Sequence, residues 1–245
     1  MTVIATSESN KIRSPNEIEL EIVRIDSQLS NCGVQFLPWI GKKYQRGYKQ
    51  RRLLILGESH YSKWHDKGVL KNHRLSPTFT RQCVEEVKQR YEGPAPFWPY
   101  IEQALLQKVR VGGWAPGGDK IWDQIAFYNF VQTPVDIPNT SPSRKQFHDS
   151  HPAFKAVIEA LRPQRVIVCG SRLWKGMPAT AHDNGKLDLF LRTDIQGYRL
   201  DDGTPIWCLV INHPSRAFRW SKWHYAISAF LSKPEKAVPI LSTLR

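Results

Sequence analysis

The stretch LLILGESHY, residues Leu53–Tyr61, decides the fold class. Its first four residues are apolar, follow a pair of arginines and end at Gly57. A short apolar run bounded in this way is typical of a strand buried on both faces, as in a parallel sheet. The polar residues Glu58 to Tyr61 then come just past the carboxyl end of the strand, where open α/β sheets bind their ligands.

The rest of the chain alternates between helical and strand patterns. A helix running toward Asn31 is predicted by Ser14, which suits an N-cap, and by Glu17, which completes a capping box. Further helices are expected over residues 76–91, 98–109, 151–163 and 221–231, a helical stretch over 121–125, and further strands over 127–131, 165–170 and within 205–215. This alternation predicts an α/β fold, a three-layer α/β/α sandwich with a short, mainly parallel central sheet.

The composition indicates a basic protein with one main domain. Of the 245 residues, 41% are hydrophobic and 11% aromatic, which suffices to bury a core. We expect an N-terminal extension over residues 1–50, with one helix and a basic connector, before the main domain at 51–245. The 35 Lys and Arg against 22 Asp and Glu leave a charge of +13, which favours a polyanionic partner. A basic surface that faces only solvent remains the alternative.

Cysteine usage and hydropathy point to a soluble protein in a reducing compartment. Cys169 and Cys208 lie in predicted strands, where a thiol packs as a small hydrophobic side chain, and Cys32 and Cys83 lie far from them in sequence. The apolar runs are too short to span a membrane, and the first residues lack the pattern of a secretion signal. We therefore expect a cytoplasmic protein with no membrane partner, no disulfide and no metal ion.

Three polar clusters follow or end the predicted strands. They are Glu58–Tyr61, Asn129 and Asn212–Ser215. Because the carboxyl ends of parallel strands meet at one edge of a sheet, we expect these clusters to lie together. Each also has a plain structural explanation, since Asn129 could end a strand and NHPS could be an ordinary turn.

Taken together, these motifs resemble those of the uracil-DNA glycosylase superfamily over roughly residues 53–231. GESHY after an apolar strand is similar to the water-activating loop, and YNFVQ to the strand whose Asn pairs with the flipped base. VINHPS followed by RAFRW resembles the His-Pro-Ser motif with its DNA-intercalating loop, and RVIVCGSRLW matches a further strand in order and spacing. The resemblance implies that residues 51–245 form the catalytic domain of a monomeric, cofactor-free enzyme acting on DNA.

The resemblance also implies roles for single residues. His213, as a neutral imidazole, would stabilise the charge that develops on the departing base. Asn129 would pair with one edge of that base, Phe127 would offer a stacking face, and Tyr61 would disfavour a 5-methyl group. The residues expected to contact DNA are Ser215, Arg216, Phe218, Arg219, Trp220, Arg144 and Arg172. Either Phe218 or Trp220 would fill the space left by the base, unless both simply seat the last helix.

The water-activating motif departs from the family. Ser59 stands where several branches carry Asp or Asn, and His60 replaces the usual proline. Glu58 matches the acid of the Gly-Glu-x-Pro-Gly branch, so Glu58 or His60 becomes the candidate for orienting water. That branch commonly holds an iron–sulfur cluster, but the cysteine spacings here do not reproduce its ligand set, and we expect no cluster.

The expected function is that of a monofunctional DNA glycosylase, which removes uracil or a modified pyrimidine in base-excision repair. Two alternatives stay open: excision of a modified base from invading phage DNA as antiviral defence, and a module that binds a DNA base without cutting.

Two other chemistries fit the sequence less well. Ser59 with Asp194 or Asp201 and His213 has the chain order of an esterase triad, but Tyr61 occupies the place of the second glycine of the nucleophile elbow. His148 and His151 have a spacing found in metal sites, without a third ligand in view.

Overall fold

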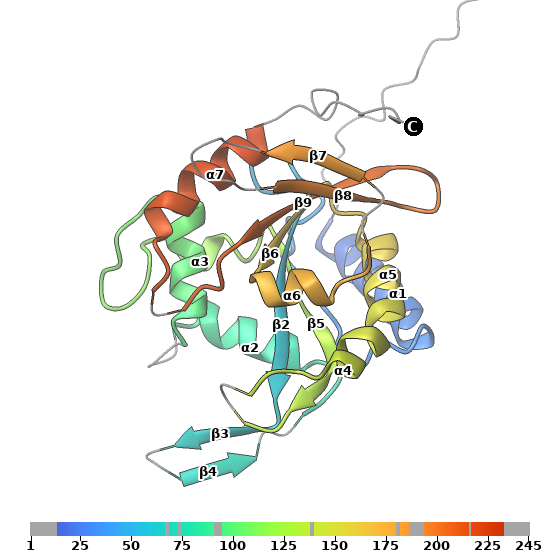
Figure 1. Ribbon diagram of the computed structural model, residues 1–245, viewed down its shortest axis with the longest axis horizontal. Coiled ribbons are helices and arrows are strands. Elements are labelled where there is room, and N and C mark those ends of the chain that lie inside the picture. The colour runs from blue at the N-terminus through green and yellow to red at the C-terminus, as the bar shows by residue number, and fades with distance from the viewer. Residues whose placement is uncertain are drawn as a thin grey trace, which may run out of the picture.

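A central sheet with helices on both of its faces organises the computed structural model, which describes residues 14–66, 69–72, 75–90, 95–137, 140–179, 182–186, 194–215 and 217–232 (Figure 1). The helices are α1 (Pro15–Asn31), α2 (Phe79–Lys88), α3 (Phe97–Leu106), the 3₁₀ helix η1 (Gly118–Lys120), α4 (Arg144–Asp149), α5 (His151–Leu161), α6 (Ser171–Gly176) and α7 (Trp220–Ser232). The strands are β1 (Trp39–Ile40), β2 (Leu53–Tyr61), β3 (Lys63–Asp66), β4 (Val69–Asn72), β5 (Ala126–Val135), β6 (Arg165–Cys169), β7 (His182–Lys186), β8 (Asp194–Arg199) and β9 (Pro205–Ile211).

The large sheet has the strand order β1-β5-β2-β6-β9-β8-β7 within the described residues. Its four central strands, β5, β2, β6 and β9, run parallel to one another. β1 joins one side in antiparallel orientation, and β8 and β7 join the other side in the same way. The α/β class is therefore confirmed, with a parallel centre and antiparallel strands at both edges of the sheet.

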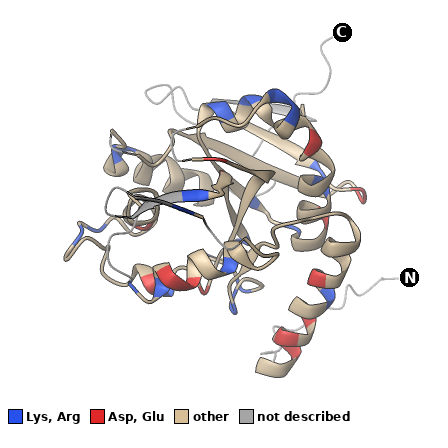
Figure 2. Ribbon diagram, turned by 90° about the horizontal axis from the view of Figure 1, so that it is seen from below, with Lys and Arg blue, Asp and Glu red and all other residues tan. Residues whose placement is uncertain are grey.

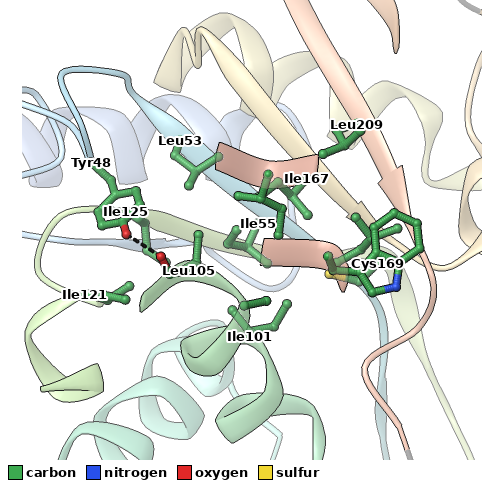
Figure 3. Close-up of a cluster of buried hydrophobic side chains, with 14 of the residues drawn as sticks. Tyr48, Leu53, Ile55, Ile101, Leu105, Ile121, Ile125, Ile167, Cys169 and Leu209 are labelled. Atoms are coloured by element: carbon green, nitrogen blue, oxygen red, sulfur yellow. Dashed lines mark hydrogen bonds between the residues drawn. The ribbon is translucent and has the colours of Figure 1, made fainter. Parts of the chain in front are cut away.

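Two hydrophobic cores cover the two faces of the sheet. Along β2, Leu53 and Ile55 point into one core and Leu54 and Leu56 into the other, as the two-residue period of a strand requires. The first core is completed by α2, α3 and α7 and the second by α1, α4, α5 and α6. Figure 1 shows α2, α3 and α7 on one side of the central strands and α1, α4 and α5 on the other. In the first core, shown in Figure 3, the hydroxyl of Tyr48 donates to the carbonyl of Leu105 at 2.8 Å.

α1 begins and ends where the sequence predicts. The Ser14 hydroxyl accepts from the backbone N–H of Glu17 at 3.3 Å, and the Glu17 carboxylate accepts from the Ser14 backbone at 2.6 Å. Ile25 and Leu29 are buried in the second core, so residues from the N-terminal 50 contribute to the same core as β2. The exposed face of α1 carries more acidic than basic side chains, visible as red bands on the helix nearest the N-terminal end in Figure 2. This charge makes α1 a poor surface for DNA.

The polar residues after Gly57 do not form a loop. They continue β2, because the neighbouring strand β5 supplies hydrogen-bond partners as far as Val135, which pairs with Tyr61. The register shifts between Ser59 and Tyr61, which is the mark of a bulge. β5 likewise runs to ten residues, twice the stretch that its aromatic sequence predicted.

Other elements differ from expectation in smaller ways. The helical stretch expected over 121–125 is a set of turns after η1, and the β3–β4 and β7–β8 hairpins and α6 were not predicted. Cys169 and Cys208 are buried as predicted, whereas Cys32 is exposed, and all four thiols are free. None of the described helices is both long and apolar enough to cross a membrane.

Candidate functional site

The carboxyl ends of the four parallel strands bring three of the predicted residues to one edge of the sheet. Glu58 lies near the end of β2, Asn129 lies on β5 beside it, and His213 follows β9 directly. The fourth strand, β6, ends at Cys169, and the N–H of the following Gly170 donates to the carbonyl of Ile211 at 2.9 Å and so joins the ends of β6 and β9. The polar clusters predicted from sequence therefore share this edge.

Gly57 makes room for the side chain of Asn129. The two residues are register partners on β2 and β5, and a Cβ on Gly57 would overlap Asn129 Oδ1 and approach Phe127 Cζ to 3.0 Å. The absence of a side chain at Gly57 lets the Asn129 amide lie across the neighbouring strand. Asn129 is 8% exposed, so its amide is held at the floor of the site.

His60 holds that amide from the other side. Asn129 Nδ2 lies 3.2 Å from His60 Nδ1, and His60 Nε2 lies 2.8 Å from Thr80 Oγ1. A neutral ring with its proton on Nε2 satisfies both contacts, since Nδ1 then accepts from Asn129 and Nε2 donates to Thr80. The ring is 5% exposed and packs edge-on against Phe36 and Phe79, each at 4.9 Å.

This burial changes the interpretation of His60. The sequence made it one of two candidates for orienting water, but a ring enclosed by two phenyl groups and engaged by Asn129 and Thr80 is placed to position the amide instead. The other candidate, Glu58, therefore stands alone. Ser59 is half-buried and lies one strand residue beyond Glu58, opposite Val131.

Arg172 binds the Glu58 carboxylate through two hydrogen bonds. Nε donates to Oε2 at 2.7 Å and Nη2 donates to Oε1 at 2.5 Å. The Glu58 side chain is 11% exposed, whereas that of Arg172 is 56% exposed, so the carboxylate is largely shielded from solvent while the guanidinium that binds it faces solvent. Arg172 Nη1 also donates to the Ser141 hydroxyl. Arg172, predicted to contact a phosphate, is engaged by Glu58 in the protein alone.

His213 lies in a turn that its own backbone stabilises. Its carbonyl accepts from the backbone N–H of Ser215 at 2.8 Å and from the Ser215 hydroxyl at 3.3 Å. Gly170 lies beside this residue, since a Cβ there would be in ordinary van der Waals contact with His213, 3.6 Å from its Cβ. Its φ of +125° is a backbone conformation that favours glycine.

Burial of the ring lowers the pKa of His213. His213 is an exposed residue, but the protein atoms around the inner side of its ring still disfavour the charged form. Glu58 raises this pKa and Arg172 lowers it, so the two charges oppose each other and burial decides the direction. The imidazole is therefore more readily neutral than a fully solvated histidine.

The aromatic surface beside His213 comes from Phe97 rather than from Phe127. The Phe127 ring is 1% exposed and packs against Trp98 at 4.8 Å and Trp122 at 6.2 Å, so its predicted role as a stacking face for a ligand is wrong. Phe97 is half-buried, with its ring centroid 5.7 Å from that of His213 and 5.8 Å from that of Phe127. The sequence showed only an aromatic residue at the start of a helix, which gave no signal for this position.

The loop after His213 contains one core residue among the predicted DNA contacts. Phe218 is 5% exposed and packs against Tyr100 at 5.7 Å and Trp223 at 6.4 Å, so it seats α7 and cannot act as a wedge. Trp220 is half-buried at the start of α7, and Ser215 and Arg219 are exposed. Arg216 lies outside the described residues.

The remaining predicted residues border the Arg172 side of the site. Tyr61 lies close enough to Arg172 to contribute to the raised pKa of that guanidinium, after the larger effect of Glu58. Arg144 is exposed at the first position of α4, three residues after the Ser141 that accepts from Arg172.

Among the described residues, the structure brings together neither the members of an esterase triad nor a set of metal ligands. Asp201 lies in the turn before β9 and pairs with Lys155 at 2.9 Å, whereas His213 follows the other end of β9, so an esterase triad of Ser59, Asp201 and His213 is excluded. The side chain of Asp194 lies outside the described residues. His151 donates to the carbonyl of Gly176 at 2.9 Å, and the described residues contain no group of three His, Cys, Asp or Glu side chains suited to a metal ion.

No protein-family model matches this chain, and a search of curated proteins returns no match to its sequence.

Proposed function

We propose that this protein is a monofunctional DNA glycosylase with a uracil-DNA-glycosylase-like fold, and that it hydrolyses the N-glycosidic bond of a flipped-out uracil or modified pyrimidine. The observation that carries the proposal is that Glu58 on β2, Asn129 on β5 and His213 just after β9 lie along the same edge of the parallel strands, with Phe97 beside His213. A carboxylate, an amide, a readily neutral imidazole and an aromatic face are the groups that removal of a base requires.

His213 would stabilise the leaving group. Cleavage of the glycosidic bond puts negative charge on the departing pyrimidine, mainly on its ring oxygen and nitrogen atoms, and a neutral imidazole N–H can donate to such an oxygen. The lowered pKa of His213 supports this role, because the ring stays neutral in the neutral pH range. One such donor typically contributes about 10²–10³ in rate.

Asn129 would select the base. Its Nδ2 has two hydrogens, of which His60 accepts one, so the second hydrogen and Oδ1 remain for the edge of a pyrimidine. The His60 contact also fixes which end of the amide faces β2, and with it the order of donor and acceptor that a base meets. Phe97 would stack on the face of the base.

Glu58 would act on the sugar and on water. As the base leaves, positive charge develops at C1′ of the deoxyribose, and an ionised carboxylate stabilises that charge and orients the attacking water. The water oxygen bonds to C1′, its proton passes to Glu58 or to solvent, and the base takes a proton as it is released. The product of this reaction would be an abasic site in an intact strand.

A non-catalytic base-binding module is the second candidate. It is favoured by one observation, the engagement of both Glu58 oxygens by Arg172, which competes with any water for the same carboxylate. Under this alternative, Asn129 and Phe97 bind the flipped base and no bond is broken.

Single-turnover excision distinguishes the two functions. Oligonucleotides with uracil or modified pyrimidines, including those found in phage DNA, are incubated with excess protein, treated with alkali and resolved on a gel. We expect strand breaks with at least one base, lost in His213→Ala and retained in His148→Ala, a histidine whose side chain is 82% exposed outside the site. Binding without abasic product across all bases would favour the module, and a product from phage-type bases alone would favour defence over repair.

A further inference from the structure

A second polar surface lies next to the candidate site, in a groove of about 710 Å³ between α3 and the first turns of α7. We call it the α3–α7 groove, and its described lining residues include three cations and no acidic side chain: Arg110, Arg219 and Lys222. All three cations are exposed. A depression lined in this way attracts a polyanion, because phosphate contacts release bound counterions.

Aromatic side chains stand between these cations. Tyr225 is 64% exposed, Trp220 is half-buried, and the guanidinium of Arg110 lies 4.6 Å above the ring of Tyr100. Exposed aromatic rings that alternate with cations are the pattern by which proteins bind single-stranded nucleic acid, since bases stack on the rings and phosphates bind the cations. Duplex DNA keeps its bases stacked inside and offers no face to these rings.

Gln103, which lines the groove, holds an unpaired hydrogen-bond acceptor below the groove surface. The residue is 2% exposed, and its buried Oε1 has no hydrogen-bond partner among the described residues, so a ligand reaches this atom only when the side chain shifts. A buried amide oxygen without a donor costs about 1–3 kcal/mol. Nucleobases carry N–H groups that could supply the donor, whereas phosphate alone could not, so Gln103 favours a ligand with bases as well as charge.

The groove is continuous with the candidate site along α3. Phe97, whose ring lies beside His213, is followed at successive helical turns by Tyr100 and by Gln103, about 9 Å further along the axis. Phe218 contacts Tyr100 and also lines the groove, so the segment after His213 leads into it. A strand that leaves the site would meet the groove within a few nucleotides.

We propose that the α3–α7 groove binds the single-stranded DNA that flanks the target nucleotide, with bases on Tyr225 and Trp220, phosphates on Arg110 and Lys222, and a base N–H on Gln103. The identity of the strand as DNA rests on the proposed function, but the groove itself is defined by residues outside the catalytic cluster. The protein is thus suited to a target whose neighbouring nucleotides are unpaired.

Fluorescence anisotropy with the full chain tests this inference. The probe is a labelled, unmodified 12-nucleotide single strand, titrated at several salt concentrations, with an equivalent duplex as comparison. We expect Tyr225→Ala to weaken single-strand binding about tenfold, equivalent to about 1.4 kcal/mol. Lys222→Ala should lower the salt dependence by about 0.7 in the log–log slope, the contribution of one phosphate contact on a single strand.

Two further variants make the outcome decisive. Gln103→Leu removes the unpaired oxygen without opening a cavity, so we expect unchanged or higher thermal stability together with at least threefold weaker binding. Lys43→Ala, an exposed lysine near α1, is the matched control and should leave binding unchanged. Equal binding of all four variants, or tighter binding of the duplex than of the single strand, overturns the inference.

The experiments distinguish failure of the groove inference from failure of the glycosylase proposal. If wild-type protein excises a base but the groove variants bind the single strand normally, the groove inference is wrong and the glycosylase proposal stands. If no base is excised but Tyr225→Ala and Lys222→Ala weaken binding, the groove is supported and the glycosylase proposal is not.

Discussion

Arg172 and Glu58 form a paired, two-bond contact at the mouth of the candidate site, with the carboxylate nearly buried and the guanidinium largely exposed. The exposed guanidinium can reach a DNA phosphate, which replaces one anionic partner of the arginine by another, and the energy of that contact must offset the loss of the arginine by the nearly buried carboxylate. We therefore expect Arg172 to move to the DNA backbone when the substrate binds and to leave Glu58 free to act.

The first prediction tests Glu58. Glu58→Gln keeps the size of the side chain and, through its amide oxygen, one of the two hydrogen bonds from Arg172, but it removes the charge, so we expect single-turnover excision to fall about 10²–10³-fold. DNA affinity should change by less than about threefold, as measured by anisotropy on the same oligonucleotide. An unchanged excision rate would remove Glu58 from the mechanism.

The second prediction concerns pH. Because burial lowers the pKa of His213, the excision rate should fall to half at a pH below about 6.5, the pH at which an ordinary histidine is half protonated. The stability of the fold should depend on pH in the same direction. At His213 the folded state binds fewer protons than the unfolded state, so the free energy of unfolding decreases as the pH drops below about 6.5. A rate that halves at pH 6.5 would contradict the prediction.

The effect of Glu58 on the pKa of His213 offers an internal control. Glu58 raises the pKa of His213, so Glu58→Gln should lower that pKa further. NMR titration of the His213 ring, assigned by comparison with His213→Ala, measures both values. A higher pKa in Glu58→Gln would show that the two residues do not interact as the geometry indicates.

The third prediction concerns the close approach of Gly57 and Asn129. Gly57→Ala places a methyl group on the Asn129 amide and beside the Phe127 ring, which should lower the free energy of unfolding by about 1–3 kcal/mol in urea titrations. The double variant Gly57→Ala with Asn129→Ala removes the overlapped oxygen and should recover part of that loss. Additive losses in the double variant would mean that the two side chains do not compete for space.

How much of this site could be predicted depends on the range of the interactions that build it. The capping box of Ser14 and Glu17 and the buried run before Gly57 depend on neighbouring residues, and both were predicted. The extension of β2 through residues 58–61 depends on hydrogen bonds from β5, some 70 residues away, which local polarity does not reveal. Strand continuation against the local pattern is a tertiary effect.

The roles of the side chains also divide into those set by nearby residues, which could be predicted, and those set by distant segments, which could not. His213 follows a strand directly, and its place at the sheet edge was predictable from that strand alone. His60 also follows an apolar run, but its burial depends on Phe36 and Phe79 from two other segments. Phe127 is buried and Phe97 takes the partly exposed position beside His213, because the choice of exposed ring depends on how α3 packs on β5.

The fourth prediction tests the positioning role of His60. His60→Ala leaves the Asn129 amide and the Thr80 hydroxyl without their partner and opens a cavity between two rings, so the free energy of unfolding should fall by about 2–5 kcal/mol. Thr80→Val removes only the hydroxyl contact and should cost about 1 kcal/mol. In Thr80→Val the pH dependence of excision should match that of the wild type, since His60 is not the group that titrates in the reaction. A shifted pH profile would restore His60 as a catalytic candidate.

The last prediction distinguishes a core residue, Phe218, from a proposed DNA contact, Trp220, in the segment after His213. Phe218 is packed between Tyr100 and Trp223, so Phe218→Ala should lower the free energy of unfolding by about 3–5 kcal/mol. Trp220 is half-buried on the groove rim, so Trp220→Ala should cost less stability and weaken DNA binding by about tenfold, a loss that persists when the DNA carries no target base. Urea unfolding and anisotropy on both variants measure the two effects. If Trp220→Ala unfolds the protein as readily as Phe218→Ala does, both residues seat α7, and the aromatic side of the groove reduces to Tyr225.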